Sequence, residues 1–402
     1  MTMVDRPPAP ARNDVAVAPP ILIDVSRSIW RYWSGRLPTG IDRVCLAYVE
    51  HFGLRAQAVV QWKRRRIVLT AANSRRLIAL LVAPGLPSRQ KLIAVLGKAI
   101  PTAFASAPQR GQLYLNIGHT GLNDDSLVTW IAHHGLRAVH LIHDLIPIET
   151  PEFCRPGESG RHVQRMTNAL RSASGIIGNS EATLTALRDF AAQHGLPCPP
   201  MVAAWLAGDV LPAEVAPTPA DHPYFVVVGT IEGRKNHLLL LQVWKRLVER
   251  LGDAAPRLLL VGQRGWEAEG AFALLDRSIA LQGVVIERGR CDDRALAGLL
   301  KGARALLMPS FAEGFGMPVI EALQLGAPVI ASDLAVFREI ADTIPTFIPV
   351  HDAGEWERTI LDFCGPSPER ARQIAAMRAY RAPSWEGHFA IVERWLETLH
   401  AR

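Results

Sequence analysis

Cysteine is scarce in this sequence of 402 residues. It has five cysteines, an odd number, and no two of them form a C-x-x-C pair. Disulfide frameworks and zinc sites usually show an even number of cysteines or closely spaced pairs. The scattered set therefore points to neither, and we expect reduced thiols in a cytosolic protein.

Long apolar runs are absent as well. No run reaches the roughly 18 to 20 apolar residues that cross a bilayer, so no membrane span is predicted. Residues 1–20 are rich in proline, alanine and valine, but they lack the compact apolar block and basic lead of a secretion signal. We expect them to form a disordered tail.

The overall composition is that of a globular protein with two domains. Apolar residues make up 49% and charged residues 20% of a chain that is too long for one ordinary core. The net charge of +6 suits an anionic nucleotide, an acidic lipid or a nucleic acid equally well. The arginines do not alternate with aromatic residues as in a recognised nucleic-acid-binding module, so we expect no nucleic-acid partner.

Short apolar runs alternate with amphipathic stretches on both sides of a proline-rich segment at 208–223. Such alternation predicts right-handed βαβ units and parallel sheets. We predict a first domain at 21–207, a linker at 208–223, a second domain at 224–383 and a final helix at 384–402. Strands of the second domain are expected near 224–228, 258–261, 284–287, 305–308 and 328–331.

One stretch, residues 308–321, organises the second domain. Glu313 and Glu321 lie eight positions apart around a Gly-Phe-Gly turn, and Pro318 is tolerated in a first helical turn. The pattern predicts a strand, a glycine loop and a helix whose first amides can hold an anion. Two carboxylates would repel a bare phosphate, but they accept hydrogen bonds from hydroxyls. The combination favours a nucleotide sugar.

Three motifs together resemble a known family. They are Glu313-x7-Glu321, the segment Gly-Thr-Ile-Glu-Gly-Arg-Lys-Asn at 229–236, and Gly-Ala-Pro-Val at 326–329. The family is the large retaining glycosyltransferase family 4, or group 1, which includes many bacterial mannosyltransferases. The resemblance covers roughly residues 222 to 342. It implies the α/β GT-B fold, in which two Rossmann-like parallel-sheet domains face a deep cleft and the first domain receives the acceptor.

The resemblance also implies roles on the donor side of the cleft. Glu321 would hold the ribose hydroxyls, Glu313 the hydroxyls of the transferred sugar, and Arg234 and Lys235 the departing diphosphate. The remaining donor-binding residues it implies are Gly229, Gly314, Phe315, Gly316 and Met317. Because the sequence has no Asp-x-Asp motif, we expect neither a metal nor another cofactor.

Two histidines are candidates in the first domain. His143 begins the segment His-Asp-Leu-Ile-Pro, which resembles a histidine motif that faces the transferred sugar in this family; we expect it to be catalytic. His119 lies in a loop at the end of another predicted strand, where ligands of parallel sheets bind. A structural role remains an alternative for both.

Three further residues are assigned to the acceptor side of the cleft. Thr39 can cap a helix with Gly40 at its mouth. By analogy with the family, Gly40 approaches the donor phosphates or the acceptor. Arg43, on the first turn of that helix, could serve an anionic acceptor or leaving group, or it could be a solvated helix arginine. Ser180 stands near the cleft in the family, although an ordinary helix cap would also explain it.

Basic and apolar clusters alternate between residues 75 and 107, and residues 62–66 are strongly basic. Such segments can lie in a layer of anionic lipid headgroups. They can equally be helices packed on the sheet with solvated charges. A peripheral contact with the inner face of a membrane is one of these two open interpretations.

The resemblance implies a retaining glycosyltransferase, and the lack of an Asp-x-Asp motif predicts that it needs no metal. We expect a hexose donor, first mannose from GDP-mannose, and otherwise a UDP- or dTDP-hexose such as rhamnose. The expected acceptor is a saccharide or lipid-linked saccharide of capsule, lipopolysaccharide or exopolysaccharide synthesis. The alternatives are a nucleotide-sugar 2-epimerase and a partner subunit that binds a nucleotide sugar without turnover.

Overall fold

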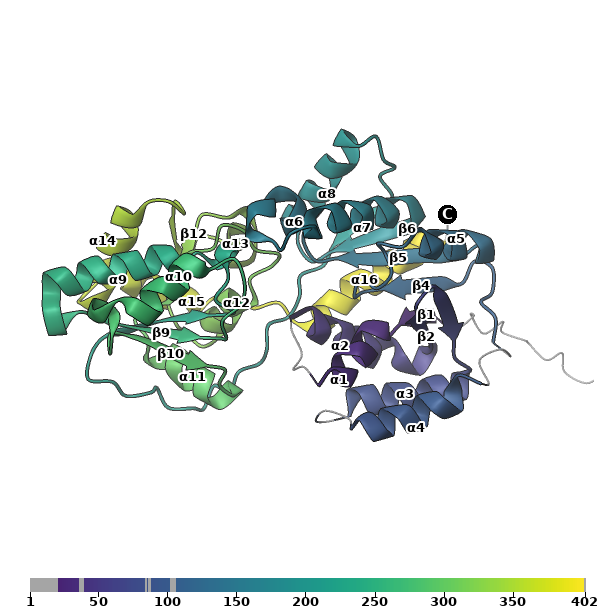
Figure 1. Ribbon diagram of the computed structural model, residues 1–402, viewed down its shortest axis with the longest axis horizontal. Coiled ribbons are helices and arrows are strands. Elements are labelled where there is room, and N and C mark those ends of the chain that lie inside the picture. Colours follow the sequence, from purple (N-terminus) through teal and green to yellow (C-terminus); the bar gives the residue numbers. More distant parts are fainter. Residues whose placement is uncertain (1–20, 36–39, 84, 86–87, 102–105, 401–402) are drawn as a thin grey trace, which may run out of the picture.

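The computed structural model describes residues 21–35, 40–83, 85, 88–101 and 106–400. The predicted tail at 1–20 and the predicted cap Thr39 lie outside these ranges. The described chain forms two lobes, each built on its own sheet (Figure 1). We call them the first lobe, with the seven-stranded sheet, and the second lobe, with the six-stranded sheet.

The sheet of the first lobe has the strand order β3-β2-β1-β4-β5-β6-β7. Neighbouring strands in it are parallel, except β2 and β3, which are antiparallel. Its strands are β1 (Ile21–Asp24), β2 (Ala56–Trp62), β3 (Arg65–Val68), β4 (Leu113–Asn116), β5 (Arg137–Ile142), β6 (Ala173–Gly178) and β7 (Met201–Ala203). The helices between them are α1 (Ser26–Trp33), α2 (Gly40–Phe52), α3 (Ala71–Val82), α4 (Arg89–Ala99), α5 (Asp125–His134), α6 (Ile146–Glu149), α7 (Glu158–Ser172) and α8 (Glu181–Gln193).

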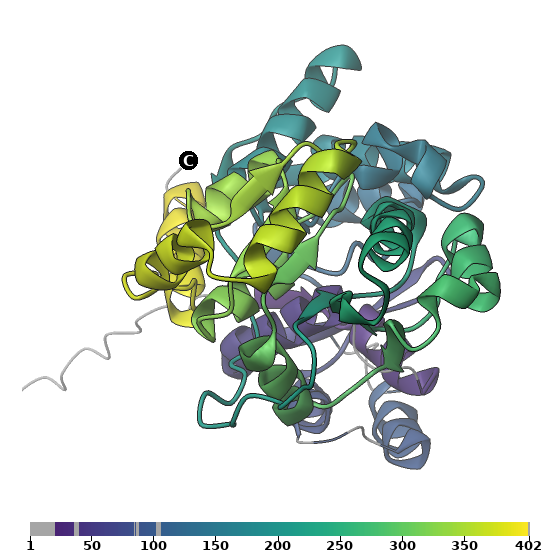
Figure 2. The same ribbon diagram turned by 90° about the vertical axis from the view of Figure 1, so that its left-hand side faces the viewer.

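The sheet of the second lobe is parallel throughout, in the order β10-β9-β8-β11-β12-β13. Its strands are β8 (Tyr224–Val228), β9 (Arg257–Val261), β10 (Val285–Gly289), β11 (Leu306–Met308), β12 (Val329–Ser332) and β13 (Thr346–Ile348). Its helices are α9 (His237–Leu251), α10 (Glu269–Arg277), α11 (Asp293–Gly302), α12 (Met317–Gln324), α13 (Ala335–Ala341), α14 (Ala353–Cys364) and α15 (Pro368–Met377). Figure 2 looks onto this lobe, with the first lobe behind it. The predicted α/β class with parallel sheets is confirmed.

Apolar runs explain where these strands form. In β8, β11 and β12 nearly every side chain is buried, which is typical of a parallel sheet covered on both faces. The five strands predicted for the second lobe all overlap observed strands. The carboxyl ends of these strands, where ligands bind in parallel sheets, carry the loops considered below.

The last helix, α16 (Trp385–His400), packs on the first lobe. His388 hydrogen-bonds the Tyr48 hydroxyl at 2.8 Å, and Arg137 of β5 donates to the Leu399 carbonyl at 3.2 Å. Gly175 of β6 lies so close to Trp395 that a Cβ there would come within 2.6 Å of the indole. The chain therefore returns from the second lobe to the sheet where it began (Figure 1).

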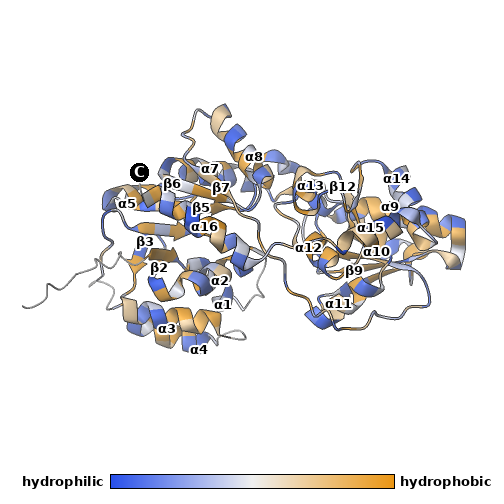
Figure 3. Ribbon diagram, turned by 180° about the vertical axis from the view of Figure 1, so that it is seen from behind, coloured by the Kyte–Doolittle hydropathy of each residue, from blue (hydrophilic) through white to orange (hydrophobic). Residues whose placement is uncertain are grey.

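None of the helices in the described ranges is both long and apolar enough to span a bilayer. In α3 and α4, apolar and polar residues alternate along the helices (Figure 3). Leu77, Leu81 and Leu92 are buried there, whereas Ile93 is 52% exposed. One face of this helix pair thus packs inward, and the other carries apolar and basic side chains to the surface.

Candidate active site

The glycine loop between β11 and α12 has the predicted strand, loop and helix order. Gly316 has φ of 101°, and a Cβ there would come within 2.6 Å of the Phe337 ring. Both facts require glycine. Pro318 occupies the first turn of α12, where its missing N–H costs no hydrogen bond because the first amides of a helix have no intrahelical partner.

Glu313 is the centre of a buried ion cluster on this loop. Arg234 donates to it at 2.8 Å and the Ser310 hydroxyl at 2.7 Å, and Lys235 also contacts it. Burial alone would raise the pKa of Glu313, but Arg234 and Lys235 outweigh it and lower the pKa to about 2. Glu313 is therefore ionised at every physiological pH.

The two cations come from the short helix η4 (Gly233–Lys235), which follows β8. Glu232 pairs with Arg234 at 2.7 Å, and burial raises the pKa of Glu232. Gly229, with φ of 136°, lies against the other cation, because a Cβ there would be 3.6 Å from Lys235 Nζ. Burial also lowers the pKa of Lys235, an effect that Glu313 partly offsets.

His143 stands opposite the glycine loop, on the first lobe. A Cβ on Gly314 would come within 2.8 Å of the His143 carbonyl oxygen, so the two lobes touch here. The ring Nε2 of His143 donates to the Ile117 carbonyl at 2.8 Å, and burial lowers the pKa of His143 to about 4. The ring is therefore neutral at pH 7.

His119 is a close neighbour of that ring. The two ring centres are 5.1 Å apart, and Nε2 of His119 donates to the Leu141 carbonyl at 2.9 Å. Burial lowers the pKa of His119 well below its usual value. The structure thus brings together the two histidines that the sequence placed at separate strand ends.

A second group gathers where α2 of the first lobe meets α12. A Cβ on Gly40 would come within 2.5 Å of Met317, while Arg43 pairs with Asp209 of the segment between the lobes. The Asp209 amide donates to Glu321 at 3.3 Å. Burial raises the pKa of Glu321 to about 7, against an opposing effect of Arg43. Arg43 is thus an ion-paired residue on a helix, and its side chain is still 38% exposed.

The two remaining candidates, Ser180 and Phe315, are buried. Ser180 is fully buried and caps α8, since its hydroxyl accepts from the Thr183 amide at 3.0 Å. The capping alternative therefore accounts for Ser180. Phe315 is also buried, within the glycine loop.

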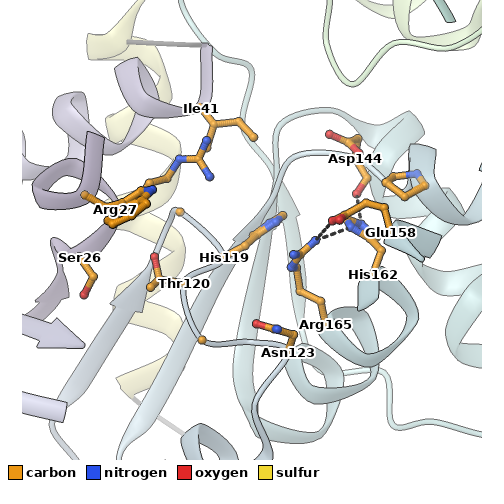
Figure 4. A pocket seen from close by; sticks show the side chains of 14 residues that line it. Ser26, Arg27, Ile41, His119, Thr120, Asn123, Asp144, Glu158, His162 and Arg165 are labelled. Carbon is orange, nitrogen blue, oxygen red and sulfur yellow. Dashed lines mark hydrogen bonds and ion pairs between the residues drawn. The ribbon is translucent and has the colours of Figure 1, made fainter. Parts of the chain in front are cut away.

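Two cavities lie beside these residues. One, of about 290 Å³, lies between the lobes and is lined by Glu313 and Phe311 from the second lobe and by Asp144 and Thr183 from the first. The other, of about 440 Å³, lies in the first lobe (Figure 4). Within the described ranges, no group of three His, Cys, Asp or Glu side chains is arranged to hold a metal ion.

Sequence reasoning missed four side chains at these places. Glu232 orients Arg234, and Arg27, Asp144 and Arg165 line the cavity of the first lobe. Asp144 could have been found, since it follows His143 in the quoted motif. No local pattern distinguishes Arg27 or Arg165 from the many other arginines in the chain.

Comparison with known proteins finds a matching family model and similar sequences. Residues 213–379 match the family model described as "Glycosyl transferases group 1". Over 222 residues the chain is 30% identical to the O-antigen chain mannosyltransferase B of Escherichia coli, a match that covers 52% of this chain and 57% of that one. The chain thus spans little more than half the length of this curated relative.

Solved structures extend the likeness over both lobes. Sucrose-phosphate synthase of Thermosynechococcus elongatus superposes with a TM-score of 0.62 at 17% identity, covering 95% of this chain and 99% of that one. HepE of Anabaena, solved in complex with UDP, gives 0.60 at 16% identity with the same coverage. Residues 213–379 thus resemble the group 1 glycosyltransferase family, and the two lobes together have the GT-B fold.

Proposed function

We propose that this chain transfers a hexose from a nucleoside diphosphate sugar to a saccharide acceptor. The observation that carries the proposal is the convergence of Arg234, Lys235 and Glu313 on the glycine loop, opposite His143. Cations, loop amides and a carboxylate are the groups that a diphosphate and sugar hydroxyls need.

The cluster can serve the bond-breaking step. As the bond from sugar to diphosphate breaks, negative charge builds on the diphosphate oxygens, and Arg234 and Lys235 stabilise it. Each charged hydrogen bond contributes about 1.5 to 3 kcal/mol, so three or four contribute several kcal/mol. At about 1.4 kcal/mol for each factor of ten, this corresponds to a rate increase of thousands-fold.

The proposal also covers the donor, the stereochemistry of transfer and the need for a metal. GDP-mannose is the first donor, supported by the His143-Asp-Leu-Ile-Pro segment and by the likeness to a mannosyltransferase. We further propose transfer with retention of configuration, without a metal, and without another cofactor. The two cations at the carboxyl end of β8 would then supply the charge that a metal supplies in other transferases.

A panel of nucleoside diphosphates tests the proposal. A ligand that binds the folded state alone raises the melting temperature. We expect one base, first guanine, to give the largest shift, and EDTA to leave that shift unchanged. If none of GDP, UDP, dTDP, ADP and CDP stabilises the protein, the proposed function is wrong. Nucleotide release that occurs only with an acceptor present would then separate transfer from epimerisation.

We also propose that the acceptor is lipid-linked and that the protein works at the cytoplasmic face of a membrane. Lys91 and Lys98 are exposed on α4 beside the exposed Ile93. Apolar side chains with flanking cations suit an anionic lipid surface. Flotation with liposomes that contain phosphatidylglycerol at low salt tests this part, and failure to float would end it.

A further inference from the structure

Helix α2 of the first lobe begins against helix α12 of the second (Figure 1). A Cβ on Gly40, the first residue of α2, would come within 2.5 Å of the methyl group of Met317, the first residue of α12. Arg43 and Glu321 each lie about one turn further along their helix. The two side chains therefore belong to the same junction between the lobes.

The segment that joins the lobes passes through this junction. A Cβ on Gly208 would lie 3.2 Å from Ile320 and 3.3 Å from Cγ of Glu321, so the backbone of the segment packs directly on α12. Asp209 follows, and its side chain pairs with Arg43 while its backbone amide donates to Glu321 at 3.3 Å. One residue of the segment thus connects a helix of the first lobe with a carboxylate of the second.

The carboxylate of Glu321 has few other contacts that fix its position. Among the residues that the structure describes, the Asp209 amide is its one hydrogen-bond donor, and no cation pairs with it. Three side chains donate to Glu313, by contrast. Residues 204–212 form neither helix nor strand, so secondary structure does not fix the Asp209 amide. The orientation of Glu321 therefore depends on what holds this segment in place.

The charges around Glu321 also involve Arg43. Burial, together with Asp293 of α11, raises the pKa of Glu321, Arg43 opposes them, and the result is a pKa of about 7. Arg43 thus favours the ionised carboxylate, which accepts more hydrogen bonds from hydroxyls than the protonated form does. Arg43 is connected to Glu321 both through the Asp209 backbone and through its charge.

We propose that Arg43 is a positioning residue of the donor site and that it acts through Asp209. The inference rests on the proposed function and on the ribose role that the resemblance implies for Glu321. The ion pair fixes the course of the joining segment, the Asp209 amide then holds Oε1 of Glu321, and Oε2 is left for a ribose hydroxyl. The sequence assigned Arg43 to an anionic acceptor or leaving group, whereas this pairing links it to the ribose of the donor.

The exposure of the ion pair separates this role from a purely structural one. The side chains of Arg43 and Asp209 are 38% and 33% exposed. Pairs with this exposure contribute little to the stability of a fold. Loss of the pair should therefore weaken donor recognition and leave the melting temperature of the free protein nearly unchanged.

Ligands that differ by one hydroxyl test the proposal. Isothermal titration of the full chain uses the nucleoside diphosphate with the largest thermal shift, first GDP, and its 2′-deoxy and 3′-deoxy forms. In the wild type, at least one deoxy form should bind about tenfold or more weakly, because it lacks a hydrogen bond to a charged carboxylate. In Arg43→Gln and Asp209→Ala, which both keep the Asp209 amide, the complete nucleotide should bind about fivefold or more weakly. That deoxy form should change less than about twofold, because it does not use the affected carboxylate.

Two other ion pairs provide matched controls. Arg246→Gln removes an arginine that is 43% exposed and pairs with Glu357, and Glu214→Ala removes a carboxylate of the same joining segment that pairs with Arg294. Both controls should keep the wild-type ratio between the complete nucleotide and its deoxy form. Arg43→Lys keeps a cation opposite Asp209 and should recover part of that ratio.

Three results would overturn the proposal. Equal binding of the complete nucleotide and both deoxy forms by the wild type would remove the ribose role of Glu321. Equal weakening of every ligand in Arg43→Gln would mean that Arg43 serves the diphosphate or the fold in general. An unchanged ratio in Asp209→Ala would mean that Arg43 does not act through Asp209. All three leave the proposed function intact, which fails only if no nucleoside diphosphate binds the wild type, and this inference then fails with it.

Discussion

Glu313 holds two cations in a site from which water is largely excluded. Its partners Arg234 and Lys235 are themselves largely buried, so each charge depends on the others. Removing one member of a buried ion pair leaves an uncompensated charge and typically costs about 3 to 5 kcal/mol. The residues that we assign to the donor are therefore also residues on which local stability depends.

Glu313→Gln tests this coupling. We predict that the unfolding free energy falls by at least about 3 kcal/mol, because glutamine cannot neutralise two cations. We also predict that transfer activity is lost. Chemical denaturation measures the first and a transfer assay the second. Glu357→Gln is the matched control, since Glu357 also pairs with two arginines, Arg246 and Arg250, but at the surface. The control should lose no more than about 1 kcal/mol, and an equal loss in both variants would refute the argument.

The raised pKa of Glu321 gives a second prediction, which concerns how the stability of the fold depends on pH. Burial raises its pKa from 4.5 to about 7 in the folded protein. Between these values the folded state binds a proton that the unfolded state has released, so stability falls as pH rises towards 7. In Glu321→Gln this contribution disappears, and the variant should melt above the wild type at pH 8.

Melting curves at pH 5 and pH 8 measure the effect. Glu249→Gln, at an exposed glutamate of α9, should keep the wild-type difference between the two pH values. If Glu321→Gln also keeps that difference, the folded carboxyl does not have the raised pKa.

At the scale of the element, uninterrupted apolar runs made the strands of the second lobe predictable. Helices bury the apolar runs of β8, β9, β11 and β12, so nearly every residue of these strands is apolar and the runs stand out from the flanking sequence. Short strands such as β7 and β13, with partly exposed side chains, carry no such signal. The glycine loop was predictable because a positive φ and a tight contact leave only glycine as a solution.

Only part of the candidate site was predictable, because some of its residues lie in local motifs and others are brought together only by the fold. Arg234, Lys235 and Glu313 belong to local motifs, and the structure brings them into contact. Arg27 and Arg165 line opposite sides of the first-lobe cavity and come from two helices that are far apart in sequence, so local pattern gives no hint that they share a cavity. The pairing of Arg43 with Asp209 likewise depends on how the segment between the lobes runs.

Gly316→Ala tests whether the glycine loop requires glycine at this position. We predict a marked loss of stability, because the new methyl group meets Phe337 in addition to the strain of a positive φ. Gly326→Ala separates the two effects, since Gly326 also has a positive φ of 72° but no described atom within 4 Å of the added Cβ. Denaturation of both variants should show the greater loss for Gly316→Ala. Equal losses would mean that the Phe337 contact does not matter.

At the scale of the molecule, Glu339 of α13 joins the two lobes. Its carboxylate accepts from the Glu181 and Ala182 amides at the start of α8, at 2.7 and 3.0 Å, and from the Trp205 indole at 2.6 Å. A carboxylate at a helix N-terminus also benefits from the helix dipole. Phe153 of the first lobe stacks on Phe311 of the second, with ring centres 4.6 Å apart. These contacts hold the lobes against each other at the cavity between them.

Glu339→Gln should loosen this junction. The amide side chain carries no charge for the α8 amides and accepts fewer hydrogen bonds, so we predict a larger radius of gyration in small-angle X-ray scattering and a changed Trp205 emission. Glu249→Gln again serves as the surface control. An unchanged radius and an unchanged emission spectrum would show that Glu339 does not hold the lobes together.

The proposed function requires that protein cations, Arg234 and Lys235, hold the diphosphate of the donor. Its most direct measurement is isothermal titration, in EDTA, of the nucleoside diphosphate that gives the largest thermal shift, into the wild type and into Lys235→Ala. We predict binding by the wild type and a dissociation constant at least about tenfold higher in the variant, the loss of one charged hydrogen bond. Equal affinity in both proteins, or binding that disappears in EDTA, would contradict the account.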